Sequence, residues 1–171
     1  MASTAADDRS VDSDDVRKAV TAAGLGNALE WFDFSIYAYT AGTIGHVFFA
    51  QGAGGDSLLK SLMFFAVAFA VRPLGGLFFG PLGDRIGRSK VLAATIILMS
   101  LGTVMIGLMP TYAQIGIWAP IGLLVARLIQ GFSTGGEYGG AATFICEYAP
   151  DKTRGFLGSF LEFGTLGGYI V

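Results

Sequence analysis

Long apolar stretches are the feature that most limits what this chain can fold into. A helix needs about 20 predominantly apolar residues to cross the hydrocarbon core of a bilayer. Four stretches reach that length and a fifth begins near the end of the sequence: Gly24–Ala50, Leu58–Gly80, Val91–Met109, Ile115–Gly140 and Phe156–Val171. We therefore predict an all-α membrane protein, with a polar tail at 1–18 and a transmembrane region at 19–171.

The composition agrees with a membrane protein and excludes several other classes. Only 14% of the residues are charged, whereas soluble domains carry about a quarter. The net charge of −2 argues against a nucleic-acid partner. One cysteine, Cys146, and one histidine, His46, are too few for a zinc or haem site. We expect no cofactor and no metal.

Lys and Arg residues are distributed unevenly between the breaks that separate the apolar stretches. Eight of the eleven lie before the first stretch, between the second and third, or between the fourth and fifth: Arg9, Arg17, Lys18, Arg85, Arg88, Lys90, Lys152 and Arg154. The opposite side has only Lys60, at the very start of the second stretch. Since basic loops stay in the cytoplasm, the N-terminus is predicted to be cytoplasmic. The last stretch stops at Val171, short of a comfortable span, so we also expect that the natural protein continues.

Six ionisable side chains interrupt the apolar stretches: Glu30, Asp33, Arg72, Arg127, Glu137 and Glu162. Each costs at least about 2.5–3.5 kcal/mol at the centre of a membrane span, so they are expected to face one another, water or a substrate. The helical rise places Asp33 and Arg72 at a similar depth, about 12–14 Å from the cytoplasmic ends of their helices. Arg127 is expected somewhat deeper. Glu137 lies close enough to the cytoplasmic end to reach the interface.

These charges allow two interpretations. In the first, they line a polar cavity in which Glu30 or Asp33 gains and loses a proton, which changes its attraction to Arg72 or Arg127. In the second, they form a static ion pair that only fixes helix packing. Intramembrane charges usually mark a pathway, which favours the first interpretation.

Glycines recur at a spacing of four residues, which places them on one side of a helix. The pairs are Gly76/Gly80, Gly131/Gly135, Gly135/Gly139, Gly136/Gly140 and Gly164/Gly168. Small residues at this spacing allow membrane helices to approach closely. Four glycines between 135 and 140 also predict that this part of the fourth helix deforms easily.

Two further patterns are typical of chemical or binding sites. The segment Gly131–Gly135 matches the G-x-S-x-G motif of serine hydrolases, but it lies within an apolar helix and His46 is predicted at the opposite side of the membrane. We therefore predict that the chain is not an enzyme. Aromatic residues between 31 and 39 suggest either a cage for a quaternary ammonium group or ordinary interfacial aromatics. Trp31 and Tyr37 are the candidate substrate contacts.

Two motifs resemble those of the major facilitator superfamily. Residues Gly80–Lys90 resemble its G-x-x-x-D-R-x-G-R-R/K loop between helices 2 and 3, with Ser89 where the family often has a second base. Residues Arg127–Gly131 resemble its R-x-x-Q-G motif on helix 4. The resemblance implies a coupling role for Arg127 and Gln130. It also implies a cytoplasmic gate that is formed by Gly80, Asp84, Arg85, Gly87 and Arg88, where glycine allows close packing and a tight turn and Asp84 caps the next helix or pairs with a base.

A narrower resemblance, to the metabolite:proton symporters, covers nearly everything after Val16. It rests on Gly26–Phe34, Arg72–Gly76, Gly131–Tyr138 and Glu147–Asp151, while Gly116–Pro120 points to the branch of bacterial proline/glycine betaine transporters. It implies twelve helices in two halves, of which this chain supplies about five. It further implies symport of a small zwitterionic or anionic solute with a proton across the bacterial inner membrane. Open alternatives are a transport-inactive fragment, a membrane subunit, or a carrier of dicarboxylate, citrate or shikimate.

Overall fold

The computed structural model describes residues 13–50, 56–148 and 153–170, and in these ranges it contains helices and no strand. The six helices follow in chain order: α1 Ser13–Phe48, α2 Asp56–Ile86, α3 Arg88–Leu108, α4 Tyr112–Ile115, α5 Trp118–Tyr148 and α6 Arg154–Ile170. Part of the break expected between Gly140 and Phe156 falls on residues 149–152, which lie outside the described ranges.

The helices cover the predicted stretches but have different ends. Helix α1 begins eleven residues before Gly24, and α2 continues beyond Gly80 to Ile86, into the break that was expected before Val91. Only Gly87 separates α2 from α3, and its φ of 99° is a backbone conformation that favours glycine. The stretch predicted from Ile115 is divided at Gly116 (φ 59°) into the short α4 and the long α5.

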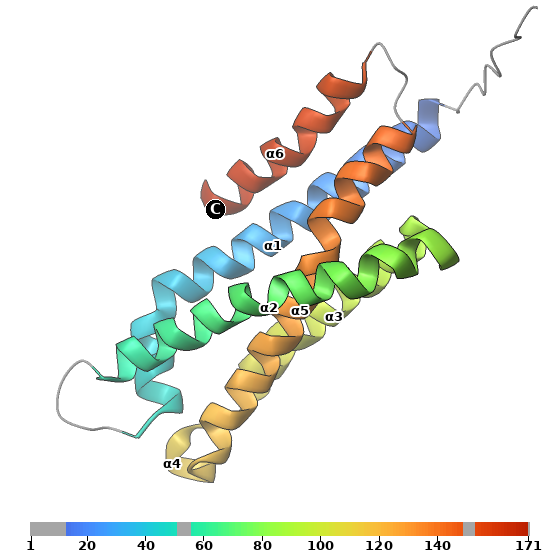
Figure 1. The fold of residues 1–171 in the computed structure, drawn as a ribbon. Coiled ribbons are helices and arrows are strands. Elements are labelled where there is room, and N and C mark those ends of the chain that lie inside the picture. The colour runs from blue at the N-terminus through green and yellow to red at the C-terminus, as the bar shows by residue number, and fades with distance from the viewer. Residues whose placement is uncertain (1–12, 51–55, 149–152, 171) are drawn as a thin grey trace, which may run out of the picture.

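Helices α1 and α5 form the centre of the bundle, because each of them contacts all the other described helices. Helix α6 packs along α1, while α2 and α3 pack along α5 (Figure 1). The side chain of Asn27 on α1 fixes α6 by donating hydrogen bonds to the Leu161 carbonyl and the Thr165 hydroxyl, both at 2.6 Å. The two central helices are also the ones that carry most of the embedded ionisable residues.

Glycines bring α5 into backbone contact with α2. A Cβ added at Gly131 would lie 2.7 Å from the carbonyl carbon of Ala68, and one added at Gly135 would lie 2.8 Å from that of Arg72. Both distances are shorter than an ordinary van der Waals contact. Gly164 and Gly168 of α6 pack in the same way against α1. At these positions the four-residue spacing correctly predicted close helix approach.

Other glycines of the same pattern do not take part in close packing. A Cβ at Gly80, Gly139 or Gly140 would meet no atom within 4 Å. The prediction that Gly80 permits close packing is therefore wrong for the described residues. The spacing alone could not distinguish these positions, because it places residues on one side of a helix without showing whether another helix covers that side.

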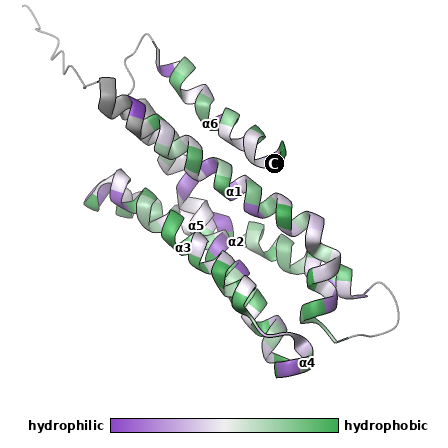
Figure 2. Ribbon diagram, turned by 180° about the vertical axis from the view of Figure 1, so that it is seen from behind, coloured by the Kyte–Doolittle hydropathy of each residue, from purple (hydrophilic) through white to green (hydrophobic). Residues whose placement is uncertain are grey.

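Hydropathy and exposure distinguish the outside of the bundle from its centre. Two described helices, α2 and α3, are long and apolar enough to cross a membrane. Large apolar side chains such as Leu77, Leu108 and Phe163 are exposed, whereas hydrophilic residues lie where α1, α2 and α5 meet (Figure 2).

Candidate functional site

Five of the six embedded ionisable residues come together between α1, α2 and α5. Glu30, Arg127 and Glu137 are each at most 2% exposed. Burial of an unpaired charge is so costly that such groups require partners. The contacts divide into two clusters, one around Asp33 and one around Arg72. Glu162, by contrast, is an exposed residue of α6 and takes no part in the contacts described below.

The Asp33 cluster joins three helices. Arg127 Nη1 on α5 lies 3.5 Å from Asp33 Oδ2 on α1, and Gln130 Nε2 donates a hydrogen bond to the same oxygen at 3.0 Å. Thr103 of α3 donates its hydroxyl to Asp33 Oδ1 at 2.9 Å and accepts a bond from Gln130 Nε2 at 2.9 Å. Both oxygens of this carboxylate are therefore engaged. Gln130, which was implicated only by the resemblance, lies directly between the charged group and α3.

Arg127 is also held from its other side by an aromatic ring. Its guanidinium carbon lies 3.5 Å from the centre of the Tyr37 ring. The Tyr37 hydroxyl donates to the Ser61 carbonyl on α2 at 3.0 Å and accepts from the Ser61 hydroxyl at 3.1 Å. Tyr37 is 1% exposed. The structure thus places this candidate substrate aromatic beneath Arg127, with both its ring face and its hydroxyl already in contact with protein.

The second cluster pairs Arg72 of α2 with Glu30 of α1, at 3.3 Å between Nη2 and Oε1. The guanidinium carbon lies 4.2 Å from the centre of the Phe69 ring, 4.5 Å from that of Phe34 and 5.7 Å from that of Trp31. Trp31, the other candidate substrate aromatic, therefore lies beside a charged group. Unlike Arg127, the Arg72 side chain remains 22% exposed.

Glu137 is the third buried carboxyl group and has no ion-pair partner among the described residues. Neither of its side-chain oxygens has a hydrogen-bond partner there. It interacts electrostatically with Glu30 and Arg72, and a Cβ added at Gly26 of α1 would lie 3.0 Å from its Oε1. The expectation that Glu137 could reach the interface is wrong, because its carboxyl group is enclosed against α1.

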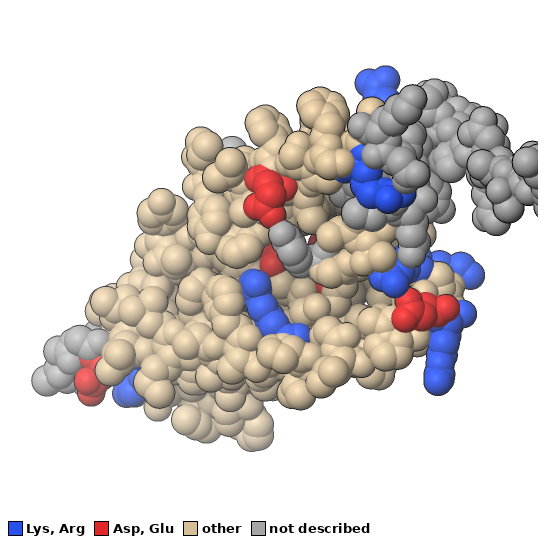
Figure 3. Space-filling model, turned by 45° about the horizontal axis from the view of Figure 1, so that its top comes forward, with Lys and Arg blue, Asp and Glu red and all other residues tan. Residues whose placement is uncertain are grey.

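A cavity of about 340 Å³ between α1 and α3 reaches the Asp33 cluster and the buried Glu137. Asp33, Thr103 and Glu137 line it together with apolar residues such as Leu29 and Val104. Acidic and basic side chains are also visible in the middle of the face shown in Figure 3. This arrangement combines titratable groups with a route by which water or a proton could reach them.

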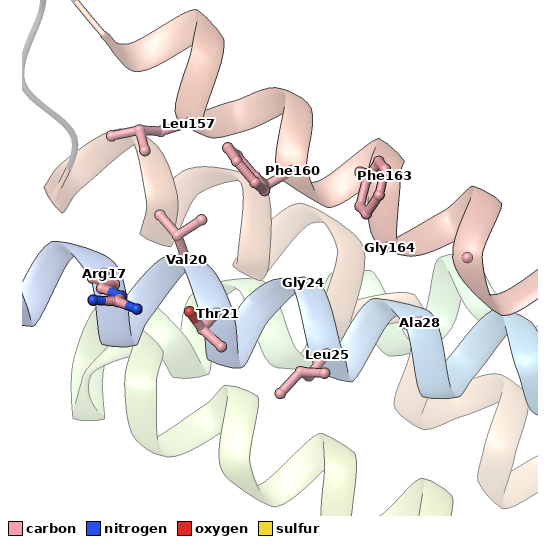
Figure 4. Close-up of a pocket in the computed structure, with 11 residues that line it drawn as sticks. Arg17, Val20, Thr21, Gly24, Leu25, Ala28, Leu157, Phe160, Phe163 and Gly164 are labelled. Carbon is pink, nitrogen blue, oxygen red and sulfur yellow. The ribbon is translucent and has the colours of Figure 1, made fainter.

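A larger cavity, about 540 Å³, lies between α1 and α6 and is of a different kind. Figure 4 shows Phe160 and Phe163 of α6 directed toward α1, and Val20 of α1 directed toward α6. None of the predicted pathway residues lines it. Apart from Arg17 and Thr21 its lining is apolar, and it contains no acidic group that could pair with the cationic part of a solute.

The loop that resembles a cytoplasmic gate is short and exposed. Arg88 Nη2 lies 2.8 Å from Asp84 Oδ1 across the turn at Gly87, so Asp84 pairs with a base as expected. Arg85 is exposed beside this pair. Basic side chains gather at the end of the molecule where α2 meets α3 (Figure 3). The gate residues therefore lie apart from the buried clusters, at one end of the bundle.

Thr103, Ser61 and Phe69 contact these clusters although no sequence pattern predicted it. Thr103 and Ser61 were detectable only as polar residues within apolar stretches, and such residues often bond to their own helix backbone. Phe69 is one of 14 phenylalanines and carried no distinguishing signal. The Ser133 of the G-x-S-x-G pattern is buried within α5 and donates its hydroxyl to the Thr95 carbonyl, so it is a helix-packing residue here.

Comparisons with known proteins were consistent with one another. The model of the family described as "Sugar (and other) transporter" matches residues 18–171. The glycine betaine/proline/ectoine/pipecolic acid transporter of Dickeya dadantii (strain 3937) is 55% identical over 161 residues. The proline/betaine transporters of Salmonella typhimurium (strain LT2) and Escherichia coli (strain K12) are 54% and 53% identical over the same length.

Each of these alignments covers 94% of this chain and 32% of the relative. The chain thus spans about a third of the length of the curated relatives that it matches. No solved protein structure matches the chain.

Proposed function

Because the chain belongs to the sugar (and other) transporter family, within the major facilitator superfamily, we propose that it forms part of a symporter for a small zwitterionic osmolyte. Proline and glycine betaine are the proposed solutes, as the names of its relatives indicate, and a proton is the proposed coupling ion. The observation that carries this proposal is the pair of charged clusters buried between α1, α2, α3 and α5.

The number of charges in these clusters supports proton coupling. Three buried carboxyl groups, Glu30, Asp33 and Glu137, face only two guanidinium groups, Arg72 and Arg127. A buried charge without a partner costs several kcal/mol, whereas a protonated carboxyl group avoids most of that cost. One proton bound within the set would bring the five groups to neutrality.

We place this proton on the cluster of Glu30, Arg72 and Glu137. Asp33 already receives an ion pair and two hydrogen bonds, whereas Glu137 and one oxygen of Glu30 have no hydrogen-bond partner among the described residues. The groups around Glu137 are Glu30 on α1 and Arg72 on α2, with uncharged Gly26 and Ile96 close by. Loss of the proton would add a charge beside Arg72 and change how α1, α2 and α5 attract one another.

The same proposal gives separate roles to the remaining residues. The contacts of Asp33 with Arg127, Gln130 and Thr103 connect α1, α3 and α5. In a transition between inward- and outward-facing states, these three helices would move together or these contacts would all break. The exposed Asp84–Arg88 pair and Arg85 are suited to contact a second half of the transporter at the cytoplasmic face. The basic end of the molecule would face the cytoplasm, because anionic lipids attract Lys and Arg.

Glu137→Gln in the full-length protein that contains this chain tests the proton site. We expect the variant to lose accumulation of labelled glycine betaine against a gradient and to retain exchange of internal for external solute. Glutamine keeps the shape of the side chain but cannot release a proton. Asp56→Asn, at the exposed start of α2, is the matched control and should accumulate solute normally. Normal accumulation by Glu137→Gln would contradict the assignment.

A further inference from the structure

The surroundings of Arg72 are those of a binding site for an organic cation. Its guanidinium group lies over the faces of Phe69 and Phe34 and near Trp31, at 4.2, 4.5 and 5.7 Å between the guanidinium carbon and the ring centres. Glu30 completes the enclosure with a carboxylate at 3.3 Å. We call this enclosure the Arg72 box. Ring faces attract weakly hydrated cations, and quaternary ammonium groups are recognised in this way.

The Arg72 box also contains hydrogen-bond donors that have no partner. Arg72 Nε and Trp31 Nε1 are buried atoms without a hydrogen bond among the described residues, whereas Arg72 Nη2 lies 3.3 Å from Glu30 Oε1 in the ion pair. Guanidinium groups bind carboxylates through two parallel hydrogen bonds when both donors are available. An anion beside Arg72 would therefore find donors that the protein itself leaves unused.

From these two observations we propose that Arg72 occupies, in this conformation, the place of the cationic group of a zwitterionic solute. When the solute enters, its ammonium group takes the position over the aromatic rings beside Glu30. Arg72 then moves aside and binds the carboxylate of the solute. This inference rests on the proposed transport function and adds to it the position and orientation of the solute.

Charge balance explains why the solute must carry both signs. A simple cation that displaced Arg72 would take its contact with Glu30 and leave the guanidinium group without a counter-charge. A simple anion would pair with Arg72 but would gain nothing from the ring faces. A short zwitterion replaces both interactions at once, so the net charge of the enclosure stays the same.

The Arg127 cluster lacks the features that make exchange feasible. Its guanidinium is enclosed by Tyr37 and by Asp33, and only 2% of its side chain is exposed. Arg72 is 22% exposed and Phe69 37%. A solute could therefore enter the Arg72 box by displacing a single side chain, whereas the Arg127 cluster offers no such entry.

Uptake of labelled glycine betaine by the full-length protein tests this inference. Phe69→Leu removes the nearest ring and keeps an apolar side chain, so we expect its half-saturating concentration to rise about tenfold, a typical effect of a desolvated cation–π contact. Phe69→Tyr keeps a ring and should restore the original value. The matched control is Phe64→Leu on the same helix, whose ring packs on Phe49, and it should leave the value unchanged.

Competition on the unmodified protein gives a second test that does not depend on folding of a variant. In 3,3-dimethylbutanoate a neutral tert-butyl group replaces the trimethylammonium group of glycine betaine with the same shape. We expect it to inhibit uptake at least tenfold less well than unlabelled glycine betaine. Equal inhibition, or equal behaviour of Phe69→Leu and Phe64→Leu, would overturn the Arg72 box while transport itself stands. Absence of uptake by the unmodified protein would overturn both proposals.

Discussion

The contact between α2 and α5 gives a quantitative prediction. Gly135 of α5 packs against the backbone of Arg72, the central residue of the Arg72 box. A Cβ at position 135 would lie 2.8 Å from the Arg72 carbonyl carbon and 3.0 Å from its Cα, whereas ordinary contacts begin at 3.4 Å. The Arg72 carbonyl oxygen would lie closer still, so Gly135→Ala requires the two backbones to separate, and insertion of one methyl group into a tight contact typically costs about 1–3 kcal/mol. Neither backbone can relieve this contact by a rotamer change.

A comparison with Gly139→Ala isolates this cost. Gly139 lies one turn later on the same helix, and a Cβ there would meet no atom within 4 Å. Both substitutions gain the same helix propensity, about 1 kcal/mol, so the difference between them measures the contact with α2. We expect Gly135→Ala to be about 1–3 kcal/mol less stable than Gly139→Ala.

Equilibrium unfolding in detergent micelles, with increasing dodecyl sulfate and helix content followed by circular dichroism, measures that difference. Solute uptake should follow the same order, because separation of the helices displaces the Arg72 backbone relative to Glu30. Equal unfolding midpoints for the two variants would refute the close packing of α5 on α2 on which the geometry of the Arg72 box depends.

Three further substitutions test individual contacts. Asn27→Ala should lower the free energy of unfolding by about 1–3 kcal/mol, because it removes two hydrogen bonds to α6; an unchanged unfolding midpoint would show that α6 is held otherwise. Tyr37→Phe should cost about 1 kcal/mol and preserve uptake, since the ring beneath Arg127 remains; lost uptake would assign a function to the hydroxyl. Asp33→Asn should cost about 3–5 kcal/mol, because it leaves Arg127 buried without a counter-charge, and should abolish accumulation; a variant that accumulates solute normally would remove Asp33 from the mechanism.

Much of the helical architecture could be predicted from the sequence, because apolar length and turn residues determine where membrane helices lie. The meeting of acidic and basic groups also followed from the sequence, since the rise of a helix gives each residue a depth. Which acidic residue pairs with which basic residue could not be predicted from the sequence. Glu30 and Asp33 are three residues apart on α1 and share one side of it, so the choice of Arg72 for one and Arg127 for the other depends on how the neighbouring helices are rotated.

Contacts that depend on tertiary packing could not be predicted from local patterns. Gly131 and Gly139 belong to the same spacing pattern, but only Gly131 is covered by α2. Thr103 contacts Asp33 because α3 packs along α5, a pairing that the sequence of α3 does not encode by itself. The position of Glu137 along its own helix gives its depth, but its burial depends on α1, which packs against its carboxyl group.

Direct detection of proton movement tests the central claim of a buried, titratable transport pathway. The full-length protein would be reconstituted into vesicles that contain a pH-sensitive dye, with no pH gradient and with the membrane potential clamped. We predict that external glycine betaine acidifies the vesicle lumen as the solute enters, and that Glu137→Gln abolishes this signal. Solute entry without any acidification would contradict the account and leave the buried charges as structural ion pairs.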